Sequence, residues 1–213
     1  MKRVLMSNKV NYWTGTEARE FEKEFAAYCG CKYAVAVNSG TASMHTILAG
    51  YGIGEGDEVI TTPFSFIATV SPIMMCGATP IFADIDPVSY NIDPKSVLER
   101  ITDKTKAIIG VDLFGLCADW TQLEKIAAEK NIRLIEDAAQ AHGAIHGKKK
   151  AGSFGDAASF SFYATKNLCT AEGGMITTDD PKLAEFCKRF RQHGMWPGKP
   201  YIYEHIGYNY RTT

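Results

Sequence analysis

The sequence has no excess of charge of either sign and no long apolar run. It carries 23 Lys and Arg against 24 Asp and Glu, a formal net charge of −1. No basic stripe of the kind that binds nucleic acid is present, and no apolar stretch is long enough to span a bilayer. Two basic residues follow the first methionine without a long apolar core behind them, so we interpret the start as mature protein rather than a signal peptide. These absences predict a cytoplasmic protein with neither a nucleic-acid nor a membrane partner.

The six cysteines, at positions 29, 31, 76, 117, 169 and 187, do not form a zinc-ligand pattern. Cys29 and Cys31 make one C-x-C pair, but no second cysteine pair or matching histidine spacing follows. We therefore predict no metal site. We interpret the cysteines as small apolar residues in a reducing cytosol.

What the sequence does contain is an alternation of short apolar strands and helices. Its 213 residues, 46% of them hydrophobic, suffice for one sizeable packed domain or for part of a larger enzyme. Strands are expected at residues 32–37, 58–62, 79–83, 106–111, 132–136, 157–162 and 174–178. Helices are expected at residues 17–30, 41–49, 66–76, 94–101, 123–130 and 181–191, with Phe21, Phe25 and Tyr28 on one face of the first. This alternation predicts an α/β fold with a largely parallel sheet covered on both faces.

Ligands gather at the carboxyl ends of strands in such sheets, so the residues that follow each strand are the candidates. The segment NSGTAS at 38–43 opens a helix, where free N–H groups and the helix dipole are suited to holding a phosphate. The same segment fits an ordinary Ser/Thr helix cap. Neither G-x-G-x-x-G nor G-x-x-x-x-G-K-[ST] is present, which removes the main support for a dinucleotide or P-loop site.

Two further strand ends carry an acid and a lysine. Asp137 follows the strand at 132–136 and precedes small residues that leave room for a flat ligand, and a carboxylate there can hold a pyridine nitrogen protonated. Lys166 lies just past the strand at 157–162, and a partly desolvated lysine can act as an imine-forming nucleophile. The ordinary alternatives are that Asp137 only caps the next turn and that Lys166 is a surface lysine. A phosphate turn, an acid and a lysine on three strand ends are together what pyridoxal 5'-phosphate (PLP) requires.

Several ordered motifs resemble one protein family. They are NSGTAS at 38–43, GEGDEVITTPFSFIAT at 54–69, GATPIFADID at 77–86, EDAAQAHGA at 136–144, GDAASFSFYATKN at 155–167, EGGMITT at 172–178 and GYNYR at 207–211. From about Tyr12 to its last residue the chain resembles the DegT/DnrJ/EryC1/StrS family of PLP-dependent sugar aminotransferases. The resemblance implies the large domain of PLP-dependent transferase fold type I, which is aspartate-aminotransferase-like. That domain has a seven-stranded, mostly parallel sheet with helices on both faces and an antiparallel strand at GMITT. We expect an N-terminal segment at 1–14 and the PLP-binding large domain at 15–213.

The resemblance also implies roles for individual residues. Lys166 and Asp137 are the implied catalytic residues: Lys166 forms the Schiff base with the cofactor, and Asp137 pairs with the pyridine nitrogen. The other implied cofactor contacts are Gly40, Thr41, Ala42 and Ser161 on the phosphate, Phe66 and Ala139 on the two ring faces, Gln140 near the phenolic oxygen, and Asn209 on the phosphate in the neighbouring subunit. The role of Asn209 implies a homodimer with shared active sites.

The activity that the resemblance implies is transamination of a keto-sugar, usually nucleotide-linked, with glutamate as the amino donor. One alternative is a sugar dehydratase on the same scaffold, but relatives of that type carry histidine where the Schiff-base lysine belongs, and Lys166 disfavours this reading. The other is a non-catalytic module. It is an alternative because family members continue past GYNYR into a long helix and a small C-terminal domain, which is expected to be absent here. His142, His193 and Arg211 suit either a substrate-facing or a structural role.

Overall fold

The computed structural model describes residues 2–10, 15–196, 198–199 and 201–212. Residues 1 and 11–14 of the expected N-terminal segment, and Thr213 at the end of the expected domain, lie outside the described residues.

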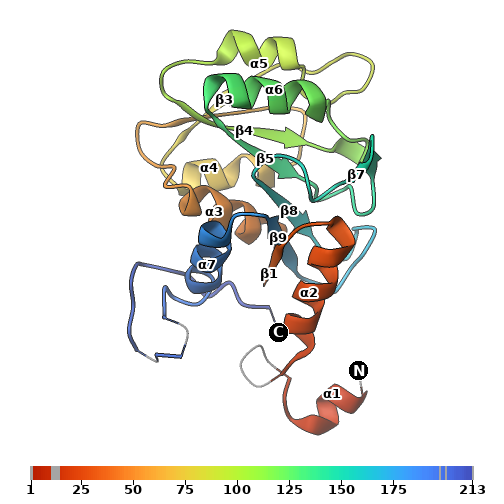
Figure 1. Ribbon diagram of the computed structural model, residues 1–213, viewed down its shortest axis with the longest axis vertical. Coiled ribbons are helices and arrows are strands. Elements are labelled where there is room, and N and C mark those ends of the chain that lie inside the picture. The colour runs from red at the N-terminus through yellow and green to blue at the C-terminus, as the bar shows by residue number, and fades with distance from the viewer. Residues whose placement is uncertain (1, 11–14, 197, 200, 213) are drawn as a thin grey trace.

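A seven-stranded sheet runs through the centre of the molecule (Figure 1). In chain order its strands are β1 (Tyr33–Val37), β2 (Glu58–Thr61), β3 (Thr79–Phe82), β4 (Thr105–Val111), β5 (Arg133–Asp137), β8 (Ala157–Ser161) and β9 (Gly174–Thr178). In space the order is β1-β9-β8-β5-β4-β2-β3. Strands β2, β3, β4, β5 and β8 pair in parallel, whereas β9 lies antiparallel between β1 and β8. The predicted mostly parallel sheet, including the orientation of residues 174–178, is confirmed.

Helices cover both faces of this sheet, because successive strand residues point to opposite sides. The helices α3 (Gly40–Gly50), α4 (Ser71–Met75) and α7 (Pro181–Phe190) pack with Ile109 and Ile135 on one face. On the other face, α5 (Pro94–Arg100) and α6 (Trp120–Lys130) pack with the neighbouring strand residues Ile108 and Leu134. The helix α2 (Glu17–Cys29) completes that second face over β1, β8 and β9, where Phe25 packs into the core. The three layers form the expected α/β architecture.

The expected helix over residues 66–76 is wrong as a single element. The chain instead forms a 3₁₀ turn, η1 (Ile67–Thr69), followed by the short helix α4. Pro72 lies in the first turn of α4, where its missing N–H costs nothing, and it is unfavourable in the interior of a longer helix. The break leaves residues 65–69 free to follow the sheet edge.

Several short elements and one side-chain orientation were not predicted. The unpredicted elements are α1 (Lys2–Ser7), a 3₁₀ turn η2 (Leu113–Gly115) and a two-stranded hairpin of β6 (Ile145–His146) and β7 (Lys149–Lys150). Tyr28 was expected beside Phe25 on the apolar face of α2, but it is half-exposed, and the Lys150 ammonium lies 4.1 Å from its ring centre. All six cysteines are free thiols, and Cys29 and Cys187 are buried. No helix within the described ranges is long and apolar enough to cross a membrane.

A buried ion pair joins α2 to the segment after α7. Arg191 is 1% exposed, and its guanidinium lies 2.5 Å from the Glu22 carboxylate. The same guanidinium donates to the Ala36 carbonyl, while the Ala36 N–H donates to Glu22 Oε1 at 2.9 Å. Both partners therefore also bond to the edge strand β1.

Candidate functional site

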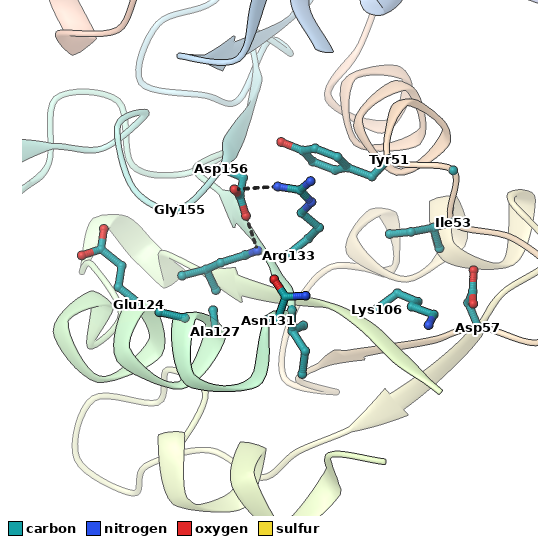
Figure 2. Close-up of a pocket in the computed structure, with 14 residues that line it drawn as sticks. Tyr51, Ile53, Asp57, Lys106, Glu124, Ala127, Asn131, Arg133, Gly155 and Asp156 are labelled. Atoms are coloured by element: carbon teal, nitrogen blue, oxygen red, sulfur yellow. Dashed lines mark hydrogen bonds and ion pairs between the residues drawn. The ribbon is translucent and has the colours of Figure 1, made fainter. Parts of the chain in front are cut away.

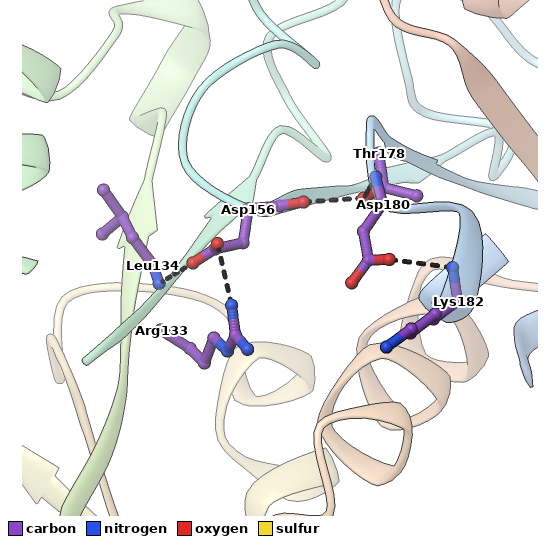
Figure 3. Close-up of polar contacts among 6 residues, drawn as sticks. All are labelled: Arg133, Leu134, Asp156, Thr178, Asp180 and Lys182. Carbon is purple, nitrogen blue, oxygen red and sulfur yellow. Dashed lines mark hydrogen bonds and ion pairs between the residues drawn. The ribbon is translucent and has the colours of Figure 1, made fainter. Parts of the chain in front are cut away.

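A cavity of about 700 Å³ at the amino ends of the strands contains none of the predicted site residues (Figure 2). The Asp156 carboxylate there bonds to the Arg133 guanidinium at 3.2 Å and accepts the Leu134 N–H at 2.8 Å. The Asp156 carbonyl accepts the Thr178 hydroxyl at 2.7 Å (Figure 3). Asp156 thereby ties β5, β8 and β9 together, so the ion pair of Asp156 and Arg133 in this cavity has a structural role.

A second cavity, of about 480 Å³, lies at the carboxyl ends of the strands and gathers most of the predicted site residues. Of the expected set, it is lined by Gly40, Thr41, Phe66, Asp137, Ala139, Gln140, Ser161 and Lys166. Because β1 and β8 both lie antiparallel to β9, and β5 pairs in parallel with β8, the residues that follow β1, β5 and β8 reach the same edge of the sheet. The three strand ends singled out from the sequence therefore meet at one site.

The expected phosphate turn, residues 38–43, lies at the start of α3, where three chain segments touch. Ser39 caps the helix, and its hydroxyl accepts the Ala42 N–H at 3.1 Å. A Cβ added at Gly40 would lie 2.8 Å from the Ser161 Cβ, so only glycine allows the start of α3 to approach the end of β8 so closely here. With the Ala42 amide bonded to Ser39, the first two amides of the helix, at Gly40 and Thr41, are those without an intrahelical acceptor. Such a turn beside a serine hydroxyl suits an anion.

Asp137 ends β5 with its carboxylate buried between two hydrogen-bond donors. The Thr69 hydroxyl donates to Oδ2 at 2.7 Å, and the Ala139 N–H donates to Oδ1 at 3.2 Å. Burial raises the pKa of Asp137, while the bonds from Thr69 and Ala139 and the charge of Lys166 oppose that rise. The carboxylate is a buried acid that its neighbours bias towards the ionised form, at the floor of the cavity.

Lys166 lies in the loop between β8 and β9, half-buried at the cavity wall. Its N–H donates to the Tyr163 carbonyl at 2.9 Å, and the Thr170 N–H closes the loop onto the Phe162 carbonyl at 2.9 Å. Within the part of the chain that the structure describes, Lys166 forms no ion pair, although its charge influences Asp137. Its amine is therefore available to a ligand in the cavity.

The residues expected to contact a flat ring lie around the cavity mouth. Phe66 is 69% exposed, and Ala139 lines the wall after β5. The side-chain oxygen of Gln140 accepts the Phe114 N–H at 2.7 Å. This bond fixes the amide orientation and leaves the Gln140 nitrogen as a donor.

Two of the expected cofactor residues do not line this cavity. The Ala42 side chain is buried in the core beneath α3. Asn209 is exposed, and its backbone carbonyl accepts the Asn38 side-chain amide at 3.3 Å, beyond the end of β1. Asn209 therefore contributes nothing to the cavity of its own chain.

Three residues whose roles the sequence left open, His142, His193 and Arg211, do not line this cavity either. His142 packs against the rings of Phe160 and Phe162, the N–H of His193 donates to the Tyr208 carbonyl at 3.0 Å, and Arg211 is half-buried outside the cavity. Among the described residues, no cluster of three or more potential ligands is placed to hold a metal ion.

Sequence reasoning missed several residues that line the site. The structure adds Ser39, Met44, Ser65, Ala68, Thr69, Val111, Tyr163, Thr165 and Glu172. Ser65, Ala68 and Thr69 come from η1 and the loop before it. Because we expected a continuous helix over 66–76, we did not identify these three residues as part of the site. Pro72 could have indicated the break, because proline favours the first turn of a helix.

Comparison with known proteins identifies the relatives of this chain. A model of the DegT/DnrJ/EryC1/StrS aminotransferase family matches residues 1–213. The GDP-perosamine synthase of Caulobacter vibrioides is 46% identical over 91% of this chain and 52% of that protein. The solved aminotransferase from Psychrobacter cryohalolentis is 42% identical with a TM-score of 0.95, over 99% of this chain and 56% of that one. NtdA from Bacillus subtilis, solved with bound cofactor PMP, is 32% identical with a TM-score of 0.92, over 99% of this chain and 48% of that one. The chain spans about half the length of the relatives it matches.

Proposed function

The chain belongs to the DegT/DnrJ/EryC1/StrS aminotransferase family, and from this premise we propose that it carries the cofactor site of a PLP-dependent sugar aminotransferase. The proposed reaction transfers the amino group of glutamate to a keto-sugar, which is nucleotide-linked. The observation that carries the proposal is the single cavity that unites Lys166, Asp137 and the phosphate turn. The name of the Caulobacter relative, a GDP-perosamine synthase, supports a nucleotide-linked sugar.

The chemistry of the cavity fits PLP. A dianionic phosphate would be held by the Gly40 and Thr41 amides and the Ser161 hydroxyl, since these donors meet at the start of α3. The ring would lie between Phe66 and Ala139, with the Gln140 side-chain nitrogen donating to its phenolic oxygen. The buried Asp137 carboxylate would face the pyridine nitrogen. When bound, PLP supplies an electron sink next to the amino group being transferred.

The chain's own groups would move the protons of this reaction. Lys166 Nζ would bond to the resting cofactor and, once displaced by the amino donor, would take up and return a proton as general base and acid. The ionised Asp137 would hold the proton on the ring nitrogen. Lysine at position 166 disfavours the dehydratase alternative, in which histidine occupies that position.

The proposed assembly is a homodimer in which Asn209 of one subunit reaches the phosphate site of the other. Exposed apolar side chains support it: Phe66 of the cavity lining, the next residue Ile67, and Phe114, whose N–H bonds to Gln140, are each more than 60% exposed. Apolar surface of this kind around a site is typical of an interface. The six free thiols support the cytoplasm as the compartment.

The proposal is tested by comparing the purified protein with its Lys166→Ala variant and with Lys182→Ala, a control on the exposed first turn of α7. Each protein is incubated with PLP and glutamate against a panel of nucleotide-linked keto-sugars. We expect Lys166→Ala to lose at least about 100-fold in turnover while still binding PLP through its phosphate and ring, and Lys182→Ala to match the wild type. Borohydride reduction should fix the cofactor on Lys166 in the wild type. Full turnover by Lys166→Ala, or reduction at another lysine, would overturn the assignment.

A further inference from the structure

Two hydroxyl groups from the segment between β2 and α4 form a chain that ends on Asp137. Ser65 Oγ lies 2.8 Å from Thr69 Oγ1, and Thr69 Oγ1 lies 2.7 Å from Asp137 Oδ2. Thr69 is only 2% exposed, and both hydroxyl residues line the cavity. Asp137 and Thr69 are therefore both buried, and Ser65 is half-buried at the cavity wall.

The direction of the hydrogen bonds follows from the chemistry of the groups. An ionised carboxylate only accepts, so the Thr69 hydroxyl must donate to Asp137. Its single proton is then committed, and the Thr69 oxygen accepts from Ser65. The Ala139 N–H holds the other carboxylate oxygen at 3.2 Å. Each oxygen thus has one donor fixed by the protein and keeps a further lone pair for a group in the cavity.

This arrangement opposes the effect of burial on the acid. Burial raises the pKa of Asp137, and the Thr69 bond is the largest influence that lowers it, ahead of the Ala139 bond and the charge of Lys166. The neighbouring acids give no such help. Glu172 lines the same cavity, Glu136 precedes Asp137 in β5, and Asp112 follows the adjoining strand β4; burial raises the pKa values of Glu136 and Asp112.

We propose that Thr69, supported by Ser65, is a positioning residue that keeps Asp137 ionised and its free lone pairs directed into the cavity. Thr69 thereby fixes the protonation of a heteroaromatic nitrogen bound there. The identity of that nitrogen, as part of PLP, rests on the proposed function. The action of Thr69 on Asp137 does not, since it is a property of the chain alone.

The direct test is the titration of Asp137 in protein free of cofactor, followed by NMR of ¹³C-labelled aspartate carboxyl groups and assigned with Asp137→Asn. Thr69→Val keeps the shape and removes the donor, so we expect the Asp137 midpoint to rise by about one pH unit or more. Thr69→Ser keeps the donor and should titrate like the wild type, and Ser65→Ala should give a smaller rise. The matched control is Thr61→Val, which removes a buried hydroxyl bonded to the Ile109 carbonyl rather than to Asp137, and should leave the midpoint unchanged.

A midpoint in Thr69→Val equal to that of the wild type overturns the proposal, as does an equal rise in Thr61→Val. If Thr69→Val does not fold, the Ser65→Ala variant provides the test, and an unchanged Asp137 midpoint in that variant overturns the proposal. A second readout uses PLP labelled with ¹⁵N in the ring. The nitrogen signal should remain that of the protonated ring in Thr61→Val and move towards the unprotonated value in Thr69→Val. Absence of PLP binding in every protein would refute the proposed function while leaving the titration result standing.

Discussion

Gly174 is the position at which one added methyl group should disrupt the phosphate turn. This glycine begins β9 and pairs with Val37 on one side and Ser161 on the other. A Cβ built on it would lie 2.2 Å from the Ser39 carbonyl oxygen and 2.8 Å from the Gly40 nitrogen. Both are backbone atoms, so no side-chain rotation relieves the clash. Gly174→Ala must therefore displace the turn itself.

The size of the displacement sets the expected loss. Ordinary contact with a Cβ begins near 3.4 Å, so the turn must move by about 1 Å, and forced repacking of this kind costs about 1–3 kcal/mol of stability. A shift of that size also removes at least one amide–phosphate hydrogen bond, which is worth about 1.5–3 kcal/mol when one partner is charged. We therefore expect the PLP dissociation constant to rise by roughly 10- to 100-fold.

The assay is a titration of each protein with PLP, followed by absorbance, alongside urea unfolding of the cofactor-free protein. Gly54→Ala is the matched control, because its added Cβ would meet only the Cys76 carbonyl oxygen at an ordinary 3.7 Å. We expect this control to bind PLP like the wild type. A Gly174→Ala variant whose PLP affinity lies within twofold of Gly54→Ala would refute the reasoning and place the anion site elsewhere.

Two further predictions concern stability. Glu22→Gln should cost about 3–5 kcal/mol in urea unfolding, because it removes the carboxylate that lies 2.5 Å from the buried Arg191 guanidinium. The double variant Glu22→Met, Arg191→Met should recover much of the loss. A cost under about 1 kcal/mol would mean that the pair behaves like an exposed one. Burial lowers the pKa of His142 from its ordinary 6.5 to about 4, so between these values the unfolded chain binds a proton that the folded chain does not. Stability should fall by on the order of 2 kcal/mol as pH drops through this window, after allowance for partial exposure. The fall should be smaller in His142→Gln. An equal fall of the free energy of unfolding with pH in the two proteins would contradict this prediction.

Most of the sheet could be predicted from the sequence because its strands are apolar on both faces. A run such as YAVAV in β1 has no polar side to present to water, so it can only lie inside a covered sheet. The site followed from the strand ends, since Asp137 ends β5 and Lys166 lies in the loop after β8. The antiparallel orientation of β9 did not follow from the residues, because the apolar pattern of a short buried strand is the same for a parallel and an antiparallel neighbour. The family resemblance supplied this orientation.

What could not be predicted depends on tertiary contacts between residues that are ordinary by themselves. Glu22 sits in a helix rich in charges and looks exposed, and only the fold brings Arg191 against it. The sequence suggests that Thr69 is one residue of an apolar helix. In the structure the helix is broken before Pro72, and the Thr69 hydroxyl donates to Asp137. In both cases the deciding partner lies far along the chain, where local sequence pattern carries no information.

The position of β9 between β1 and β8 also has a consequence for synthesis. The first strand of the sheet to leave the ribosome pairs with the last, so β1 has no neighbour in the sheet until β9 arrives. Such long-range pairing is entropically expensive and slow, and until it happens β1 and β8 present open edges on either side of a gap. A partly synthesised chain can therefore assemble β2, β3, β4, β5 and β8 into a sheet while the junction of Ser39, Ser161 and Gly174 is still missing. Closure of the sheet and completion of this junction are therefore one event, and under the proposed function a chain that holds the cofactor's phosphate has already closed its sheet.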